Sequence, residues 1–232
     1  MLNKQIAIVT GGSRGIGKAI VELLLSEGVT TAAIAKSDES LKALKEELGD
    51  KGELSTFKCD LTSSDQVNEV INEIYNQYGK IDILVNNAGV GVWSTIEEMT
   101  EEDWDAQIDL NLKGVFLTSK AVFPHMKQGG GGQIVNIASD LAYNTSEKTG
   151  AYCASKWGLL GLTGSLNKEG VHFGIRVSTV SPGLVQTDFG GAPASKKTSG
   201  LTPKTVAGQV VSVLKTSKEA ENIEVFVSHK TT

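Results

Sequence analysis

The chain has 232 residues, of which 40% are hydrophobic and 21% are charged, and its formal net charge is −5. This length and composition allow a sizeable core and exclude a disordered or fibrous protein, so we expect a single domain over residues 1–232. The acidic balance, without a lysine- or arginine-rich block, argues against nucleic acid or a membrane surface as a partner.

The N-terminal segment and the cysteines predict a cytoplasmic protein. The first apolar run, residues 6–9, is too short for a signal peptide or a membrane span. Cys59 and Cys153 lie far apart in sequence and suggest neither a disulfide framework nor a metal motif. We expect no metal site and two reduced thiols, with a nucleophilic Cys153 beside Tyr152 as the alternative.

The first half of the chain predicts strands that alternate with helices. The expected strands are residues 5–9, 30–35, 54–59 and 81–85. A glycine-rich turn and an amphipathic helix follow the first strand, and a helix ending near Gly49 follows the second. Thr62 and Asp65 resemble a capping box at the start of the next helix.

The second half continues the same alternation. The expected elements are a long helix at 101–127, a strand at 133–138, a helix at 150–172, a strand at 175–180, a helix opened by Thr202-Pro203, and a last strand at 223–227. This order predicts an α/β protein with a Rossmann-type doubly wound parallel sheet of about seven strands and helices on both faces.

Five residues suited to ligand binding or catalysis come directly after expected strands. They are Gly11, Asp60, Asn87, Ser139 and Ser181. Ligands of open α/β sheets bind at the carboxyl ends of the strands. We therefore expect one crevice that collects all five.

The turn after the first strand, Thr10-Gly11-x-x-x-Gly15-x-Gly17, is suited to a phosphate. Free amides at a helix start bind anions, and a missing Cβ lets a pyrophosphate approach. Gly12 to Lys18 also nearly forms a P-loop, but Ala19 stands where that motif requires a magnesium-binding Ser or Thr. The near match makes an ATP-binding protein an alternative, and the missing hydroxyl at Ala19 argues against it.

Tyr152 and Lys156 are four residues apart in an expected helix, about 5–6 Å apart at Cβ. An ammonium close to a phenol should make the phenol easier to ionise. Hydride transfer to a carbonyl leaves charge on oxygen, which needs a proton donor and a stabilising hydroxyl. Tyr152 and Ser139 are the candidates for these two roles.

With Asn86-Asn87-Ala88-Gly89 and Pro182-Gly183 added to these motifs, the chain resembles the short-chain dehydrogenase/reductase family over about residues 5–187. The resemblance implies a catalytic tetrad of Ser139, Tyr152, Lys156 and Asn111, in which Asn111 holds a water that refills the proton and Lys156 also bonds the nicotinamide ribose. The cofactor-binding residues that it implies are Gly11, Ser13, Arg14, Gly15, Ile16, Gly17, Lys36, Asp60, Leu61, Asn87, Ala88, Gly89, Tyr152, Lys156, Pro182, Gly183 and Thr187.

The end of the second strand, Ala35-Lys36-Ser37, decides the cofactor. An acid there binds the ribose of NAD, whereas a basic residue receives the 2′-phosphate of NADP. Lys36 is cationic, and in the family pattern Arg14 points toward the same ribose, so we expect NADP(H). Asp38, a slightly displaced acid, keeps NAD as the alternative.

The resemblance implies an oxidoreductase that acts on a small-molecule carbonyl or secondary alcohol, and we expect a carbonyl reductase. A 3-oxoacyl-acyl-carrier-protein reductase and a non-catalytic dinucleotide sensor are the alternatives. Specificity should come from three loops, at 89–95, 140–149 and 183–200. Trp93 lies in the first of them. The last loop is rich in Gly, Ala, Ser and Lys and predicts little apolar wall.

The expected assembly is a homodimer through helices 101–127 and 150–172. Many relatives continue past the last strand with a tail that joins an oligomer interface, whereas five residues follow it here. We therefore do not expect a tetramer.

Overall fold

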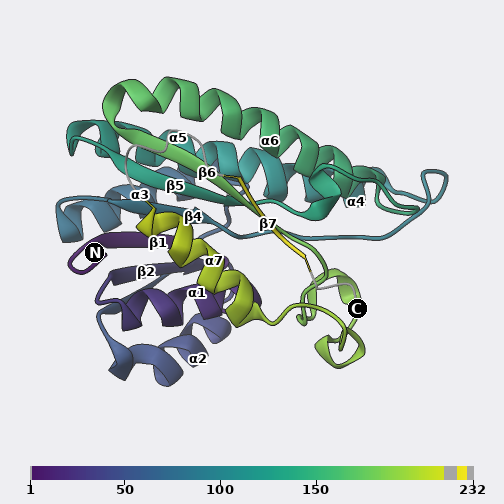
Figure 1. The fold of residues 1–232 in the computed structure, drawn as a ribbon, viewed down its shortest axis with the longest axis horizontal. Helices are drawn as coiled ribbons and strands as arrows, with labels where there is room; N and C mark the ends of the chain where they lie inside the picture. Colours follow the sequence, from purple (N-terminus) through teal and green to yellow (C-terminus); the bar gives the residue numbers. More distant parts are fainter. Residues whose placement is uncertain (1, 217–223, 229–232) are drawn as a thin grey trace.

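One sheet of seven parallel strands, in the order β3-β2-β1-β4-β5-β6-β7, forms the centre of the molecule (Figure 1). The computed structural model describes residues 2–216 and 224–228. The strands are β1 (Ile6–Thr10), β2 (Thr30–Ala35), β3 (Leu54–Lys58), β4 (Ile83–Asn86), β5 (Gly132–Ile137), β6 (Ile175–Pro182) and β7 (Glu224–Val227). The predicted doubly wound parallel sheet is confirmed, although Ile223 of the last expected strand and the tail at 229–232 lie outside the described residues.

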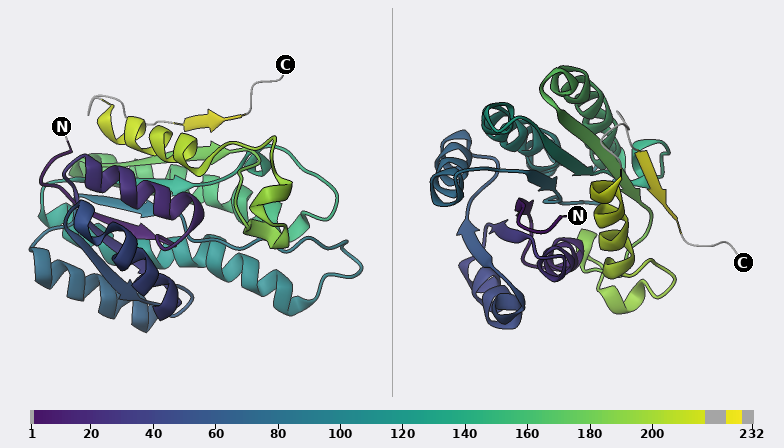
Figure 2. Two further views of the ribbon diagram at one scale, coloured as in Figure 1. Left: turned by 90° about the horizontal axis from the view of Figure 1, so that it is seen from below. Right: turned by 60° about the vertical axis from the view of Figure 1, so that its left-hand side comes forward.

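Helices cover both faces of this sheet. They are α1 (Gly15–Ser26), α2 (Asp38–Leu48), α3 (Ser64–Tyr78), α4 (Glu101–Ile108), α5 (Gly114–Gln128), α6 (Gly150–Gly170) and α7 (Pro203–Lys215). On one face lie α1, α2 and α7, and α1 and α7 lie side by side in both views of Figure 2. On the other face lie α3, α5 and α6. None of the helices within residues 2–216 is both long and apolar enough to cross a membrane.

Buried aliphatic side chains hold the layers together on each side of the sheet. Val9, Ile20 and Leu24 belong to the core between the sheet and α1, and Val210 joins it from α7. The opposite core contains Ile8, Ile71, Ile74, Met126 and Ile134. Because neighbouring β1 residues, Ile8 and Val9, enter different cores, the continuous apolar run of this strand reflects burial on both faces.

Polar side chains mark the helix starts, with one difference from the expectation. Ser37 and Thr202 cap α2 and α7 as their side chains accept hydrogen bonds from Ser40 N and Thr205 N. At α3 the cap is Ser63, whose hydroxyl accepts from Gln66 N, so the expected box at Thr62 and Asp65 was wrong. Thr62 is instead hydrogen-bonded to Asp60.

The long helix expected at 101–127 is interrupted in the middle. A π turn, Asp109–Lys113, separates α4 from α5. Such turns carry one extra residue and occur frequently at functional sites. It brings Asn111 to a buried position, where its side chain meets the loop after β4.

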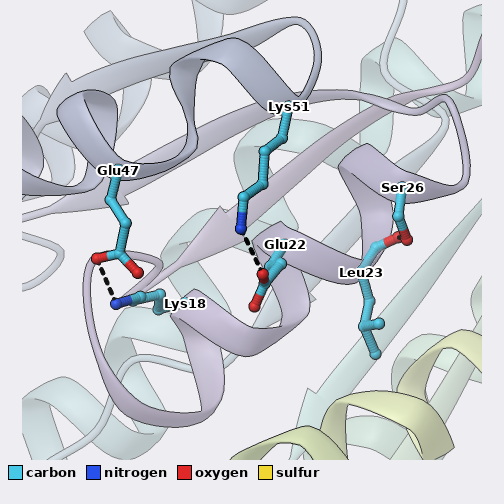
Figure 3. Close-up of polar contacts among 6 residues, drawn as sticks. All are labelled: Lys18, Glu22, Leu23, Ser26, Glu47 and Lys51. Atoms are coloured by element: carbon cyan, nitrogen blue, oxygen red, sulfur yellow. Dashed lines mark hydrogen bonds and ion pairs between the residues drawn. The ribbon is translucent and has the colours of Figure 1, made fainter.

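Two ion pairs connect α1 with the segment that contains α2 (Figure 3). Lys18 Nζ lies 2.6 Å from Glu47 Oε2, and Lys51 Nζ lies 2.6 Å from Glu22 Oε1. In a P-loop the lysine at the position of Lys18 reaches the nucleotide phosphates. Here it lies on the α1–α2 surface and does not line the cavity described below, which argues against the ATP-binding alternative.

Candidate functional site

A cavity of about 1370 Å³ opens at the carboxyl ends of the strands. Its walls come from the segments that follow β1 to β6, as expected at the switch point of a doubly wound sheet. The volume exceeds the roughly 300–1,000 Å³ of ordinary small-molecule sites. It therefore has room for a long ligand and a second, smaller one.

The structure brings the sequence-predicted residues together around this cavity. Every one of them lines its wall except Gly17, Asn111 and Ser181, so the expectation that Ser181 joins the crevice was wrong; it is buried within β6. Sequence reasoning missed several other wall residues. These are Ser40, Thr62, Leu184, Val185, Phe189 and Lys197.

The glycine turn is built for close approach. Gly11 has φ +61°, and a Cβ on Gly17 would lie only 2.1 Å from Gly11 O, so that side chains are excluded at both positions. Across the turn, Asn87 Nδ2 donates to Thr10 O at 2.9 Å and to Gly11 O at 3.2 Å. The end of β4 thereby holds the turn after β1 in shape.

The start of α1 fits an anion. No side chain of the described chain caps this helix, and its first turn contains no acidic residue. Its free amides and the positive end of its dipole face the cavity through Arg14, Gly15 and Ile16. Thr187 closes the cradle from the other side, since its Cγ2 would lie 3.2 Å from a Cβ on Gly15. These residues fit the diphosphate of a dinucleotide.

Lys36 and Asp60 form an ion pair in the part of the cavity where the sequence analysis expects the adenosine of the cofactor. Lys36 Nζ lies 2.7 Å from Asp60 Oδ2, and the lysine side chain is 80% exposed. The hydrogen bond with Lys36, helped by those from Thr62, lowers the pKa of Asp60 to about 2. Asp38 is paired with Lys58 and does not line the cavity.

Tyr152 and Lys156 lie one turn apart on α6 and are both buried. Lys156 Nζ donates to Ile137 O at 2.8 Å and lies 5.7 Å from the centre of the Tyr152 ring. Burial lowers the pKa of Lys156 to about 8. The end of β5 therefore fixes this ammonium beside the phenol.

The pKa of Tyr152 moves in the direction opposite to the expectation. Burial raises it to about 12, the Asp140 charge adds to that effect, and a hydrogen bond with Ser139 opposes it. The helix spacing alone suggested a phenol that ionises more easily. That inference was wrong for this structure because the loss of solvation outweighs the neighbouring groups.

Ser139 and Asp140 form the polar corner of the cavity. Ser139 Oγ donates to Asp140 Oδ1 at 2.9 Å and accepts a hydrogen bond from Leu141 N at 3.2 Å. Both follow β5 and begin the short 3₁₀ helix Asp140–Ala142. The hydroxyl predicted to polarise a substrate oxygen is thus held next to the Tyr152 phenol.

Asn111 is a bracing residue in this structure. Its Oδ1 accepts from Val90 N at 2.8 Å, and its Nδ2 donates to Val90 O at 2.8 Å and to Ser155 Oγ at 3.1 Å. Ser155 in turn donates to Tyr152 O. Its amide is engaged by protein atoms that position the loop after β4 and α6, and the water-holding role of Asn111 stays a prediction.

Two aromatic rings cover Tyr152. The Trp93 ring lies edge-on at 5.2 Å between centroids, and the Phe189 ring lies at 5.8 Å. Phe189 comes from the loop at 183–200. Lys197 Nζ holds the backbone of this loop by donating hydrogen bonds to Thr187 O at 2.7 Å and to Phe189 O at 2.5 Å. The expectation of little apolar wall from this loop was wrong, because one phenylalanine among small residues supplies it.

Cys153 faces away from the cavity. Its Sγ contacts Thr149 Oγ1 at 3.2 Å, and it lies outside the cavity wall. A nucleophile must reach the substrate to react. The geometry therefore disfavours the alternative in which this thiol acts in catalysis.

Comparisons with known proteins agree with this geometry. The family model described as short chain dehydrogenase matches residues 5–197. The chain is 40% identical over 190 residues to a D-threitol dehydrogenase of Mycolicibacterium smegmatis, covering 82% of this chain and 73% of that protein. It is also 40% identical over 187 residues to the 3-oxoacyl-acyl-carrier-protein reductase FabG of Thermotoga maritima, covering 80% and 76%.

A similar fold occurs in a solved structure. A metagenomic short-chain oxidoreductase in complex with NADP matches with a TM-score of 0.87 and 34% identity, over 100% of this chain and 99% of the other. Both comparisons of sequence and structure thus extend over the residues that form the cavity.

Proposed function

The chain belongs to the short chain dehydrogenase family, and from that premise we propose that it is an NADP(H)-dependent carbonyl reductase with a small-molecule ketone substrate. The general activity, that of an oxidoreductase acting on alcohol or carbonyl groups, follows from the family and its named relatives. The observation that carries the finer proposal is the buried Tyr152–Lys156 pair beside Ser139, at the far end of a cavity whose other end fits a dinucleotide.

The proton chemistry is assigned to Tyr152. When bound, the nicotinamide supplies or accepts the hydride at the carbonyl carbon. Tyr152 would give its phenol proton to the carbonyl oxygen, a role of general acid that contributes about 10²–10⁴-fold. With its raised pKa the phenol is protonated at neutral pH, which is the form that a general acid requires.

The other residues of the tetrad would support this transfer. Ser139 Oγ would turn from Asp140 to the substrate oxygen and polarise it. Lys156 would bond the nicotinamide ribose, and Asn111 would position α6 through Ser155. Pro182, Gly183 and Thr187 would meet the nicotinamide side.

The choice of NADP(H) rests on the charges at the end of β2. Lys36 and Arg14 both line the cavity there and would meet a 2′-phosphate. Asp38, the acid that kept NAD open, is engaged by Lys58 outside the cavity wall. The NADP in the similar solved structure supports the same choice.

The substrate proposal has one alternative. A 3-oxoacyl-acyl-carrier-protein reductase is favoured by the relative from Thermotoga maritima, whereas the D-threitol dehydrogenase favours a small polar molecule. The rings of Trp93 and Phe189 both line the cavity and border Tyr152. A small ketone fits this enclosure better than a long acyl thioester, and loop 183–200 would be the substrate loop.

The test is NADPH oxidation with a panel of ketones, diketones, aldehydes and 3-oxoacyl esters, together with a titration of cofactor binding. We expect turnover with small ketones and tight NADPH binding. Turnover with 3-oxoacyl esters alone would support the alternative. Binding of NADPH without oxidation across the panel would favour the dinucleotide sensor instead.

A homodimer through α4, α5 and α6 is proposed on the basis of exposed aromatic side chains. Phe116 is 43% exposed and Trp157 is 50% exposed, and such rings are common at protein interfaces. Sedimentation analysis should give twice the chain mass, and a monomer would contradict the proposal.

We propose a cytoplasmic location, since Cys59 and Cys153 are free thiols.

A further inference from the structure

Asp140 places a carboxylate in the wall of the cavity beside the proposed catalytic hydroxyls. Its Oδ1 accepts hydrogen bonds from Ser139 Oγ and Leu141 N, both at 2.9 Å. These two contacts fix the orientation of the carboxylate. Its Oδ2 points toward Gly183, where a Cβ would lie 3.5 Å away.

The second oxygen of this carboxylate has spare capacity. Within residues 2–216 and 224–228, no lysine or arginine forms an ion pair with Asp140, and Oδ2 has no hydrogen-bond donor. A carboxylate oxygen is an acceptor with about two lone-pair sites. The local fold uses Oδ1 alone, so Oδ2 is available to a ligand in the cavity.

Two apolar rings border Tyr152. Trp93 and Phe189 lie edge-on to its ring, and their own centroids are 6.4 Å apart. A substrate whose carbonyl reaches Tyr152 and Ser139 therefore lies in a cavity whose wall contains both aromatic rings and the Asp140 carboxylate. Such a pocket matches a molecule with a hydrogen-bond donor next to its reacting carbon.

The donor is better supplied by a hydroxyl than by an ammonium. Lys156 and Lys197 already line this cavity with positive charge, and a further cation would be repelled. A hydroxyl brings a donor without charge. In a vicinal diol the two oxygens are on neighbouring carbons, which suits Ser139 Oγ and the Asp140 carboxylate, themselves in contact at 2.9 Å.

We propose that Asp140 is a specificity-determining residue that accepts a hydrogen bond from a hydroxyl on the carbon adjacent to the reacting carbon. The substrates are then α-hydroxy ketones and the vicinal diols formed from them. Reduction adds a hydride from the reduced nicotinamide to the carbonyl carbon and the Tyr152 proton to its oxygen, and oxidation of the diol removes both. This inference rests on the proposed function and names the substrate class of the same site.

The experiment compares two ketones that differ only in this hydroxyl, acetoin and butanone, by NADPH oxidation. The variant Asp140→Asn keeps one oxygen that accepts hydrogen bonds from Ser139 Oγ and Leu141 N. It replaces the free oxygen by an NH2 group, which donates hydrogen bonds and cannot accept one from the substrate hydroxyl. Glu73→Gln is the matched control. It removes the same charge from an exposed side chain on α3, outside the cavity wall and the predicted specificity loops.

The wild type should reduce acetoin with the higher kcat/KM, and Asp140→Asn should lower that preference by about 10- to 150-fold, the range for losing a hydrogen bond to a charged group. Butanone turnover and NADPH affinity should change far less, and Glu73→Gln should keep the preference. As a reading independent of turnover, calorimetry should show that the diol product binds the cofactor-loaded protein more weakly after Asp140→Asn.

Equal use of both ketones by the wild type, an unchanged preference in Asp140→Asn, or a preference for an α-amino ketone would overturn the role of Asp140 while leaving a carbonyl reductase in place. Absence of turnover with every ketone despite NADPH binding would instead contradict the proposed function, and this inference with it. The two failures are therefore distinguishable.

Discussion

Replacing Lys156 by methionine should make the protein more stable at neutral pH while abolishing turnover. Lys156 is 5% exposed, and burial lowers the pKa of its ammonium from 10.5 to about 8. At about 1.4 kcal/mol for each pKa unit, holding the charge inside costs the folded protein about 3 kcal/mol. Methionine of similar length removes that cost but also the hydrogen bond to Ile137 O, worth about 1 kcal/mol. The expected net gain is about 2 kcal/mol.

The pH dependence gives this prediction its sign. Between about pH 8 and pH 10.5 the unfolded chain holds a proton on Lys156 that the folded protein has lost, so the free energy of unfolding rises with pH. The full cost is present below about pH 8. From about pH 7 to about pH 9.5 the contribution of Lys156 to stability should rise by about 2 kcal/mol, and Lys156→Met should lack this rise.

Cys59 acts in the opposite direction over part of the same range. Burial raises the pKa of its thiol from 9.0 to about 11. The folded protein therefore loses stability as the pH rises above about 9, because the unfolded thiol ionises first. This term is common to wild type and variant, so the difference between the two proteins isolates Lys156.

The assay is urea unfolding followed by circular dichroism, without cofactor and with a thiol reductant, at the two pH values. Lys168→Met, at an exposed position of the same helix, is the control and should follow the wild type. If Lys156→Met shows the same change of stability with pH as the wild type, the reasoning about a buried charge is refuted. A loss of stability at neutral pH would show that the hydrogen bond to β5 outweighs the cost of burial.

Three further substitutions test the parts of the site separately. Tyr152→Phe should reduce kcat by about 10²–10⁴-fold with an almost unchanged NADPH dissociation constant, and full turnover would remove Tyr152 from the proton transfer. Lys36→Ala should lower the ratio of kcat/KM for NADPH to that for NADH by about tenfold, whereas Lys42→Ala, on the exposed face of α2, should not; an unchanged ratio in Lys36→Ala would contradict the 2′-phosphate role. Gly17→Ala would place a methyl group 2.1 Å from a carbonyl oxygen of the glycine turn and should weaken NADPH binding more than tenfold in a fluorescence titration, while Gly208→Ala, with open space around it, should bind NADPH like the wild type.

The elements that depend on local pattern could be predicted from the sequence. The second strand has the predicted bounds, Thr30–Ala35, and Thr202 with Pro203 begins α7 as expected. Hydrophobic periodicity and capping residues carry this information within a few positions of the chain. The same applies to the glycine turn, whose spacing is itself the local constraint.

The features that were missed depend on contacts across the fold. The π turn exists where Asn111 meets Val90 and Ser155, which are far from it in sequence. An apolar pattern with helical period does not show where one extra residue is inserted. Likewise, Phe189 gains its meaning only when the loop at 183–200 folds back on Trp93 and Tyr152.

The pKa of Tyr152 shows the same limit in electrostatic terms. Its spacing to Lys156 predicts an attraction, but the sequence does not show how deeply the two groups are buried. In the folded chain one cause, removal from water, raises the pKa of the phenol and lowers that of the ammonium. Both shifts disfavour charge.

A site that disfavours its own charges responds strongly to any charge or dipole that enters it, because interactions in a low dielectric are weakly screened. Lys156 is held by Ile137 O, and Tyr152 lies against two rings, so both side chains are fixed in place. Asp140 differs from them because it is exposed to the cavity and keeps a free acceptor. The division is consistent with the separate tasks proposed above, in which buried Tyr152 transfers the proton and the exposed carboxylate selects the molecule that receives it.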